Sequence, residues 1–263
     1  MYLTEYHCHS ILSPDGFVPL AEMAEHAVAM GLSELCITDH CDLLDSHANR
    51  VHEYDWAPAV AQFRETAARF EGRLKLKLGV EFGMGHLCPA ESEAILSQPA
   101  LDFVIGSVHN LCEEKGGTDF YYVEYHTPQD CFAALDDYFD SLDKLVQTDY
   151  YDVLGHIIYP LRYMHGLGSM EPYYDRIAAL VRTAVERGKG IEVNTYRGKT
   201  VDEWRPVLER YKNAGGEIVT VGSDAHRPEH VGLGVRETYD LLKDVGFRYV
   251  AVYDKRKPEM VKL

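Results

Sequence analysis

Long apolar stretches are absent from this 263-residue sequence. No window contains the roughly 18 uninterrupted apolar residues that a membrane-spanning helix needs. Residues 1–5 also lack the basic start that opens a secretory signal peptide, and no apolar segment follows them. We therefore expect a cytoplasmic protein without a membrane partner.

Basic residues are scarce as well. The chain has 26 lysines and arginines against 42 aspartates and glutamates, which gives a formal net charge of −16. Because a surface this acidic repels polyanions, the composition argues against nucleic acid as a partner. An anionic substrate would need local positive charge from bound metal ions, a few arginines or helix N-termini.

Paired cysteine motifs, internal repeats and Pro/Ser-rich linkers are also missing. None of the six cysteines has CxxC spacing, which argues against a zinc knuckle or a thioredoxin-like redox motif. We expect reduced thiols that mostly serve in packing. Since no linker divides the chain, we expect one domain that covers residues 1–263.

The sequence does contain a regular alternation of β-rich runs and amphipathic helices. We expect strands at residues 2–8, 34–38, 74–82, 102–108, 151–154, 190–194 and 217–222. We expect helices at residues 20–30, 57–70, 91–97, 128–146, 173–187, 201–214 and 235–245. Residues 249–253 are either an eighth strand or an edge extension. This order predicts an α/β fold with a parallel sheet, most simply a closed barrel, with an open doubly wound sheet as the alternative.

Residues of metal-ligating type stand at almost every expected strand end. In chain order they are His7 and His9, Asp39 and His40, Glu81, His109, His156, and Asp224 and His226. In a barrel the carboxyl ends of all strands meet at one face, where such enzymes carry out their chemistry. Imidazole and carboxylate groups suit zinc, iron and manganese, so the pattern predicts a metal centre.

The spacing His7-x-His9 has a direct geometric meaning. Side chains two residues apart on a strand point to the same side, so this pair can bind one metal ion. Asp224 and His226 repeat the arrangement at the last strand. Two such pairs plus several single ligands exceed what one ion uses, which favours two or three metal ions with Glu81 as a bridge.

Together these motifs resemble the PHP (polymerase and histidinol phosphatase) family. The resemblance rests on His7-x-His9, Asp15, Thr38-Asp39-His40, Glu81, Ser107-Val108-His109, Gly155-His156 and Gly222-Ser223-Asp224-Ala225-His226, in this order along the chain. It implies a distorted (β/α)7 TIM-like barrel that holds two to three divalent transition-metal ions, Mn, Zn or Fe. The metal ligands that it implies are His7, His9, Asp15, His40, Glu81, His109, His156, Asp224 and His226.

Two further stretches, residues 159–163 and 192–195, are similar to the stand-alone histidinol-phosphate phosphatases of that family. The resemblance implies hydrolysis of L-histidinol phosphate to L-histidinol and phosphate, a step of histidine biosynthesis. Arg162 and Arg197 would bind the phosphate, because a guanidinium group can contact two oxygens at once. Tyr163 and Tyr196 would complete the substrate site.

Weaker candidates surround this set. Glu114 and Asp119 could face the cationic amine and imidazole at the other end of histidinol phosphate. His86 and His165 lie near loops of the expected active face and are kept in reserve as ligands. The remaining histidines outside the motifs are expected on helices and loops, as ordinary surface residues.

The implied reaction is attack of a metal-bridged hydroxide on phosphorus, in line with the departing alkoxide. Metal ions lower the pKa of bound water from ~16 toward ~7, so the nucleophile exists at neutral pH. Asp224 or His226 would deliver or relay the proton that the leaving oxygen needs, and the sequence does not choose between them. We therefore assign catalytic roles to Asp224, His226 and Glu81.

Three other interpretations stay open. An amidohydrolase also carries HxH on its first strand, but a ligating lysine on the fourth strand is typical of that class, and this chain has His109 there. A PHP-type enzyme could act on another small phosphorylated metabolite or on a nucleotide. The third interpretation is a PHP-like domain that serves as a structural module or metal binder and has no activity. Neither the metal identity nor the oligomeric state follows from the sequence.

Overall fold

Seven parallel strands form the centre of the molecule in the computed structural model, which describes residues 1–263. In sheet order they are β1 (Thr4–Cys8), β2 (Glu34–Ile37), β4 (Lys75–Gly83), β5 (Phe103–Ser107), β6 (Val153–Leu154), β7 (Gly190–Asn194) and β8 (Val219–Gly222). The short strand β3 (His40–Asp42) continues beyond β2 and pairs with the last part of β4. The sequence analysis missed β3, because three residues are too few to show an alternating pattern.

The barrel closes where β1 meets the chain that follows β8. A parallel bridge joins Cys8 and Ala225. The backbone N–H of His9 donates to the Ala225 carbonyl, and the N–H of Asp224 donates to the His7 carbonyl, each at 2.8 Å. The strands therefore form a nearly closed barrel. The predicted TIM-like α/β barrel is confirmed, and the open doubly wound alternative is wrong.

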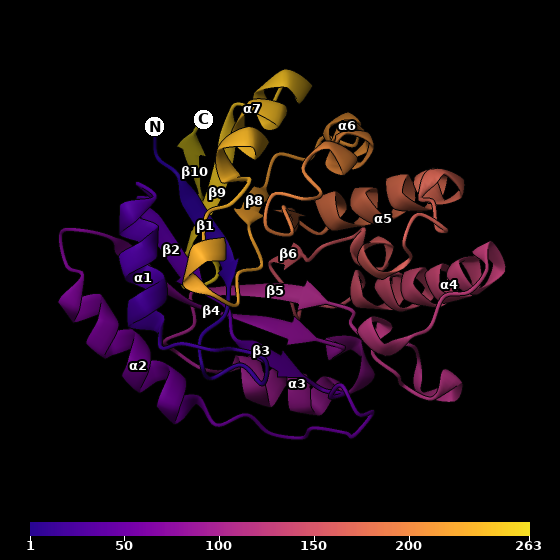
Figure 1. Cartoon of the computed structure of the whole chain (residues 1–263), viewed down its shortest axis with the longest axis horizontal. Helices are drawn as coiled ribbons and strands as arrows, with labels where there is room; N and C mark the ends of the chain where they lie inside the picture. Colours follow the sequence, from indigo (N-terminus) through magenta and orange to yellow (C-terminus); the bar gives the residue numbers. More distant parts are fainter.

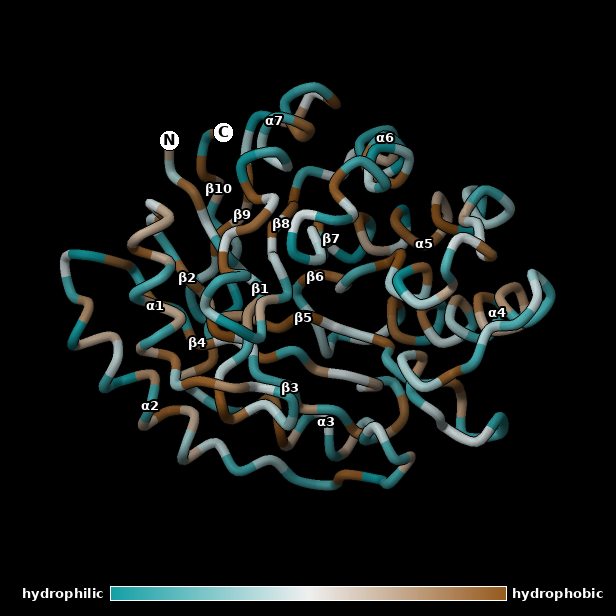
Figure 2. The backbone as a smooth tube through the Cα atoms, viewed as in Figure 1, coloured by the Kyte–Doolittle hydropathy of each residue, from teal (hydrophilic) through white to brown (hydrophobic).

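Seven α-helices surround the strands (Figure 1). They are α1 (Leu20–Ala29), α2 (Trp56–Arg69), α3 (Pro89–Leu96), α4 (Pro128–Leu145), α5 (Tyr174–Glu186), α6 (Arg205–Asn213) and α7 (Val235–Val245). Helix α5, for example, buries Ile177, Leu180, Val181 and Ala184, which lie on one helix face. The alternating brown and teal segments of the helices in Figure 2 reflect this two-sided character. No helix combines the length and the apolar character that crossing a membrane requires.

Short 3-10 helices lie in the connecting loops. They are η1 (Gly85–Leu87), η2 (Glu113–Lys115), η3 (Phe120–Tyr122), η4 (Tyr159–Tyr163), η5 (Glu171–Tyr173), η6 (Asp202–Trp204) and η7 (Pro228–His230). The helix predicted at residues 201–214 is divided into η6 and α6, with a proline in the first turn of α6. Loops η3 and η4 follow β5 and β6 and so reach the carboxyl end of the barrel.

The last segment forms a separate antiparallel hairpin of β9 (Tyr249–Asp254) and β10 (Lys257–Lys262). Residues 249–253 are therefore neither an eighth barrel strand nor an extension of the barrel edge. The hairpin binds the amino ends of the strands, since Lys255 N–H donates to Asp102 before β5 and Arg256 donates to Asp152 before β6. It closes that end of the barrel and leaves the carboxyl end for the site.

Candidate metal centre

The side chains assigned to a metal centre converge at the carboxyl end of the barrel. Strand β1 and the residue after it bring His7 and His9, β3 brings His40, β4 brings Glu81, and the loops after β5, β6 and β8 bring His109, His156, Asp224 and His226. These side chains are buried apart from His40, which is partly exposed. Asp15 lies at the rim, where its side chain is 58% exposed.

Glu81 lies between two groups of imidazoles. Its Oε1 is 2.7 Å from Nε2 of His156 and 3.0 Å from Nε2 of His109. Its Oε2 is 3.1 Å from Nε2 of His7 and 3.1 Å from Nδ1 of His40. Because the two oxygens face different histidines, this carboxylate has the geometry of a bridge between two metal positions.

Asp224 completes a group with the two histidines of β1. Its Oδ1 is 3.5 Å from Nε2 of His9 and 3.7 Å from Nε2 of His7. The two Nε2 atoms are themselves 3.1 Å apart. The three side chains could therefore hold one metal ion.

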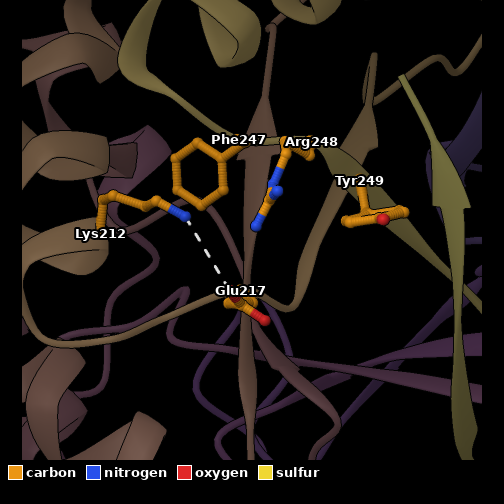
Figure 3. A pocket seen from close by; sticks show the side chains of 5 residues that line it. All are labelled: Lys212, Glu217, Phe247, Arg248 and Tyr249. Atoms are coloured by element: carbon orange, nitrogen blue, oxygen red, sulfur yellow. Dashed lines mark ion pairs between the residues drawn. The ribbon is translucent and has the colours of Figure 1, made fainter.

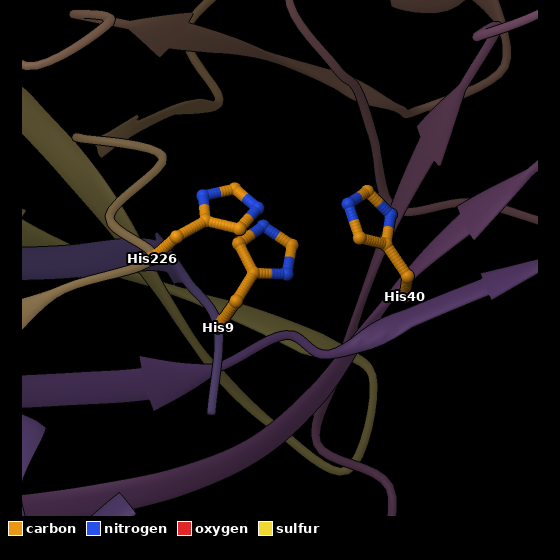
Figure 4. A group of neighbouring side chains, drawn as sticks. All are labelled: His9, His40 and His226. Atoms are coloured by element: carbon orange, nitrogen blue, oxygen red, sulfur yellow. The ribbon is translucent and has the colours of Figure 1, made fainter. Parts of the chain in front are cut away.

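A third group forms around His9, His40 and His226. The rings of His9 and His226 are stacked with centroids 4.1 Å apart, and the ring of His40 lies 4.4 Å from His9 and 6.0 Å from His226. Figure 4 shows these three imidazoles together, each on a different segment of the chain. Asp15 joins from the rim, with its Oδ2 2.9 Å from Nε2 of His226 and its Oδ1 3.8 Å from Nε2 of His40.

The contacts within the centre fit bound cations. His7 and His9 direct Nε2 toward Nε2, and His109 and His156 do the same at 3.2 Å. Buried Nδ1 of His40 and Oε2 of Glu81 have no hydrogen-bond partner, although they lie 3.1 Å apart. Ligand atoms about 2.1 Å from a tetrahedral zinc ion lie about 3.4 Å from one another, close to these separations. The donor set therefore suits divalent metal ions.

A second layer of side chains fixes the rings. Nδ1 of His7 is 2.6 Å from Oε1 of Glu192, and the other oxygen of Glu192 accepts the backbone N–H of His156 at 2.9 Å. Nδ1 of His109 is 2.7 Å from Oδ1 of Asp42. Such partners set the tautomer and orientation of a metal-binding imidazole. The sequence analysis missed Asp42 and Glu192 in this role, although His40-x-Asp42 repeats the two-residue spacing of the other pairs.

Two glycines make room for these contacts. A Cβ atom on Gly83 would lie 1.5 Å from Oδ1 of Asp42, the carboxylate that holds His109. A Cβ atom on Gly222 would lie 2.2 Å from Cβ of His7. Any larger residue at either position would therefore displace a side chain of the centre.

Burial and the local charges keep Glu81 and His9 in their ligating forms. Burial by itself raises the pKa of Glu81, but His7, His109 and His40 outweigh it and hold the pKa well below its usual value. Burial, together with His226 and His40, lowers the pKa of His9 to about 3. Glu81 is therefore a carboxylate and His9 a neutral imidazole at neutral pH, the forms that bind metal ions.

Arg162, a predicted phosphate ligand, is buried beside the centre and already has partners. Its Nη1 donates to Oδ2 of Asp224 and its Nη2 donates to Oδ1 of Asn194, both at 2.6 Å. The guanidinium also lies over the rings of Tyr196 and Tyr159, at 4.3 and 5.0 Å from their centroids. It is held in one orientation next to the side chain of Asp224.

Arg197 also lies near the Tyr196 ring, 5.3 Å from its centroid, and its buried Nε has no hydrogen-bond partner. Tyr196, Arg197 and Asp224 all have left-handed backbone conformations, with φ of 44°, 60° and 58°. This conformation is unfavourable for residues other than glycine and tends to occur at functional sites. Tyr163, the fourth predicted substrate contact, packs its ring edge-on against Tyr159 at 5.4 Å.

The weaker candidates separate into two groups. Asp119 lies at the carboxyl end of the barrel, where its backbone pairs with Asn110, the residue after His109. Glu114 is exposed on η2, His165 is exposed in the loop after η4, and His86 lies on η1; none of these three belongs to a metal-binding group.

A surface pocket lies at the opposite end of β8, before its first residue (Figure 3). Lys212, Glu217, Phe247, Arg248 and Tyr249 line it, and its lysine and glutamate are 4.0 Å apart. It contains no histidine, cysteine or buried carboxylate, so it offers no comparable chemistry.

Comparison with known proteins agrees with this geometry. Histidinol-phosphatase of Lactococcus lactis is 27% identical over 274 residues, which cover 96% of this chain and 95% of that protein. A probable histidinol-phosphatase of Thermotoga maritima is 27% identical over 266 residues, which cover 99% of this chain and 100% of that protein. The crystal structure of histidinol phosphate phosphatase from Lactococcus lactis, complexed with zinc, L-histidinol and phosphate, has a TM-score of 0.82 at 24% identity and covers 98% of both chains. At this identity the structural likeness establishes the fold.

The family match covers most of the chain. The family model of the PHP domain matches residues 5–196, which include every proposed ligand except Asp224 and His226. These two residues follow β8 and meet the matched ligands across the seam between β1 and β8. The chain therefore belongs to the PHP domain family.

Proposed function

We propose that this protein is a metal-dependent phosphatase that hydrolyses L-histidinol phosphate to L-histidinol and phosphate. The names of its relatives in Lactococcus lactis and Thermotoga maritima support this substrate. The position of Glu81 carries the proposal, because its two oxygens face separate imidazole groups as a carboxylate between two metal ions would. We further propose that two or three Zn, Mn or Fe ions bind and that residues 1–263 act as one unit.

The proposed metal ligands are those implied by the sequence: His7, His9, Asp15, His40, Glu81, His109, His156, Asp224 and His226. When bound, divalent ions supply Lewis acidity and make water acidic enough to ionise near neutral pH. Arg197, whose buried Nε has no hydrogen-bond partner, would bind a phosphate oxygen. Arg162 orients Asp224 and adds positive charge beside it.

Asp224 and His226 differ in their capacity to give a proton to the leaving oxygen. Burial raises the pKa of Asp224, but His7 and Arg162 outweigh it and hold the pKa well below its usual value. Asp224 is therefore a carboxylate that can accept a proton or orient water, and it does not enter the reaction protonated. We therefore propose that His226, which lies at the rim beside Asp15, relays the proton to the leaving oxygen through a water molecule.

A phosphate-release assay tests the proposal. Protein loaded separately with Zn, Mn or Fe should release phosphate from L-histidinol phosphate faster than from nucleoside monophosphates or sugar phosphates. No release from any phosphomonoester, with every metal supplied, would refute the phosphatase. Faster phosphate release from another metabolite would refute L-histidinol phosphate as the substrate and leave the phosphatase activity standing. The Lys212→Ala variant in the remote pocket is a control that should match the unmodified protein.

A further inference from the structure

We propose that Asp119, with the tyrosines beside it, recognises a positive charge on the part of the substrate that leaves, and so selects phosphomonoesters of amino alcohols over neutral ones. This inference rests on the proposed function and assigns a substrate class to the same site. It concerns a residue outside the metal ligands.

The position of Asp119 is fixed by the loop that carries His109. Asn110, directly after that histidine, pairs with Asp119 through an antiparallel bridge. The N–H of Phe120 donates to the carbonyl of His109 at 2.8 Å. Asp119 is thus tied by backbone contacts to a proposed metal ligand, at the end of the barrel where the phosphate would be cleaved.

The carboxylate of Asp119 can accept further hydrogen bonds. Its Oδ1 accepts the N–H of Tyr121 at 2.8 Å and so caps the short helix η3. No salt bridge to a lysine, arginine or histidine involves it, although His109 and His40 act on it electrostatically and the residue is only partly exposed. These contacts offset only part of the hydration that a half-buried carboxylate loses, and a cationic ligand would offset the rest.

A series of aromatic contacts extends from the metal centre to Tyr121, whose backbone N–H donates to Asp119. The ring of Tyr159 lies 4.6 Å from His156 and 5.4 Å from His109. Tyr163 packs against Tyr159, and Tyr121 packs edge-on against Tyr163, each at 5.4 Å. Tyr121 is 60% exposed, so the series runs from the buried centre to solvent. Aromatic rings attract an amine or an imidazolium group through their electron-rich faces.

The charges around the site would orient such a substrate. The cations Arg162, Arg197 and Lys199 gather around the ring of Tyr196 in the loops after β6 and β7. Asp119 comes from the loop after β5. A substrate with phosphate at one end and an amine at the other would therefore meet opposite charges on different loops.

The Asp119→Asn variant tests the inference, because asparagine also caps helices well and removes only the charge. We expect kcat/KM for L-histidinol phosphate to fall about 10-fold or more, the usual scale for a lost charge-assisted hydrogen bond. For phenyl phosphate, whose leaving group is neutral, the change should stay below about 2-fold on the same basis. The Asp55→Asn variant is the matched control, since Asp55 caps α2 in the same way on the surface.

Equal losses on both substrates would contradict the inference, because they would mean that Asp119 supports the metal centre. Unchanged rates on both would contradict it as well. Calorimetry supplies a readout without turnover: L-histidinol should bind Asp119→Asn about 10-fold more weakly, while inorganic phosphate binds equally. If the metal-loaded protein cleaves no phosphomonoester, the proposed function fails, and the L-histidinol binding ratio still decides the role of Asp119.

Discussion

The two ends of the barrel differ in the partners of their buried polar groups. At the amino end each buried charged group meets a group of opposite charge or a hydrogen-bond donor. Asp152 accepts hydrogen bonds from Nε of Arg256 at 2.6 Å and from the N–H of Val104 at 2.9 Å. Glu34 accepts hydrogen bonds from the hydroxyls of Tyr6 and Tyr2 at 2.5 and 2.6 Å. Those contacts stabilise the fold without an added ligand.

At the carboxyl end buried imidazoles face one another. The Nε2 atoms of His7 and His9 lie 3.1 Å apart, and those of His109 and His156 lie 3.2 Å apart. An arrangement of this kind becomes favourable when cations bind between the groups. The amino end of the barrel is therefore arranged for stability and the carboxyl end for a ligand, as expected for barrel enzymes.

Among the variants considered, Glu81→Gln should have the largest effect on metal content and activity. Removal of one charge from the bridging position should lower bound metal below the content of the unmodified protein and reduce phosphatase kcat by about 100-fold or more. Glu34→Gln is the matched control, because Glu34 is an equally buried carboxylate at the amino end. It should keep metal content and kcat. Equal loss in both variants would show that the two ends do not differ as described.

Substitution of Arg197 by alanine should give the next largest effect. Its unpartnered Nε is available for a phosphate oxygen, so KM should rise about 10-fold while metal content stays constant. Steady-state kinetics with metal analysis of the same samples measure both quantities. An unchanged KM would show that Arg197 does not bind the phosphate.

The variant Arg256→Met should lower stability at the amino end of the barrel without affecting the metal centre. It leaves the buried carboxylate of Asp152 without its cation, so the free energy of unfolding should fall by about 1–3 kcal/mol. Denaturant titration measures this change, and kcat should be unaffected. A fall in kcat at equal stability would link the hairpin to catalysis and contradict the separation of roles.

The stability of the metal-free protein should depend more steeply on pH than that of the metal-loaded protein. Burial lowers the pKa of His40, but Glu81 and Asp42 outweigh it and raise the pKa to about 9 in the metal-free protein. The folded chain then binds this proton more tightly than the unfolded chain, whose imidazole has a pKa of about 6.5. That stabilisation is complete below pH 6.5 or so and is lost as the pH rises through about 9.

A metal ion must displace the same proton, so metal affinity should increase over this pH range. Thermal unfolding between pH 6.5 and 9 should therefore show Tm falling with pH in the metal-free protein. The stabilisation that added zinc gives should grow over the same range. Parallel slopes in both samples would contradict metal binding at His40.

The sequence predicted the barrel and the convergence of the strand ends because both follow from repeating patterns. A strand alternates with period two, and parallel topology brings the carboxyl ends together whatever the loops contain. His7, Glu81 and His156 could therefore be placed near one another from their positions alone. The terminal hairpin could not be predicted, because the run at residues 249–253 reads equally well as a barrel strand.

The partners within the site could not be predicted either. That Glu192 holds His7, or that Arg162 donates to Asp224, depends on side-chain directions across strands far apart in sequence. Asp42 lies on a strand of three residues, where no periodicity is visible. Patterns of residue type predict which groups meet, whereas packing decides which atoms touch.

The most direct test of the metal centre is a measurement of bound metal together with activity in one sample of purified protein. The account predicts two or three divalent ions per chain, loss of L-histidinol phosphate hydrolysis after removal by a chelator, and recovery when Zn, Mn or Fe is restored. Hydrolysis at the full rate by protein shown to be free of metal would contradict it.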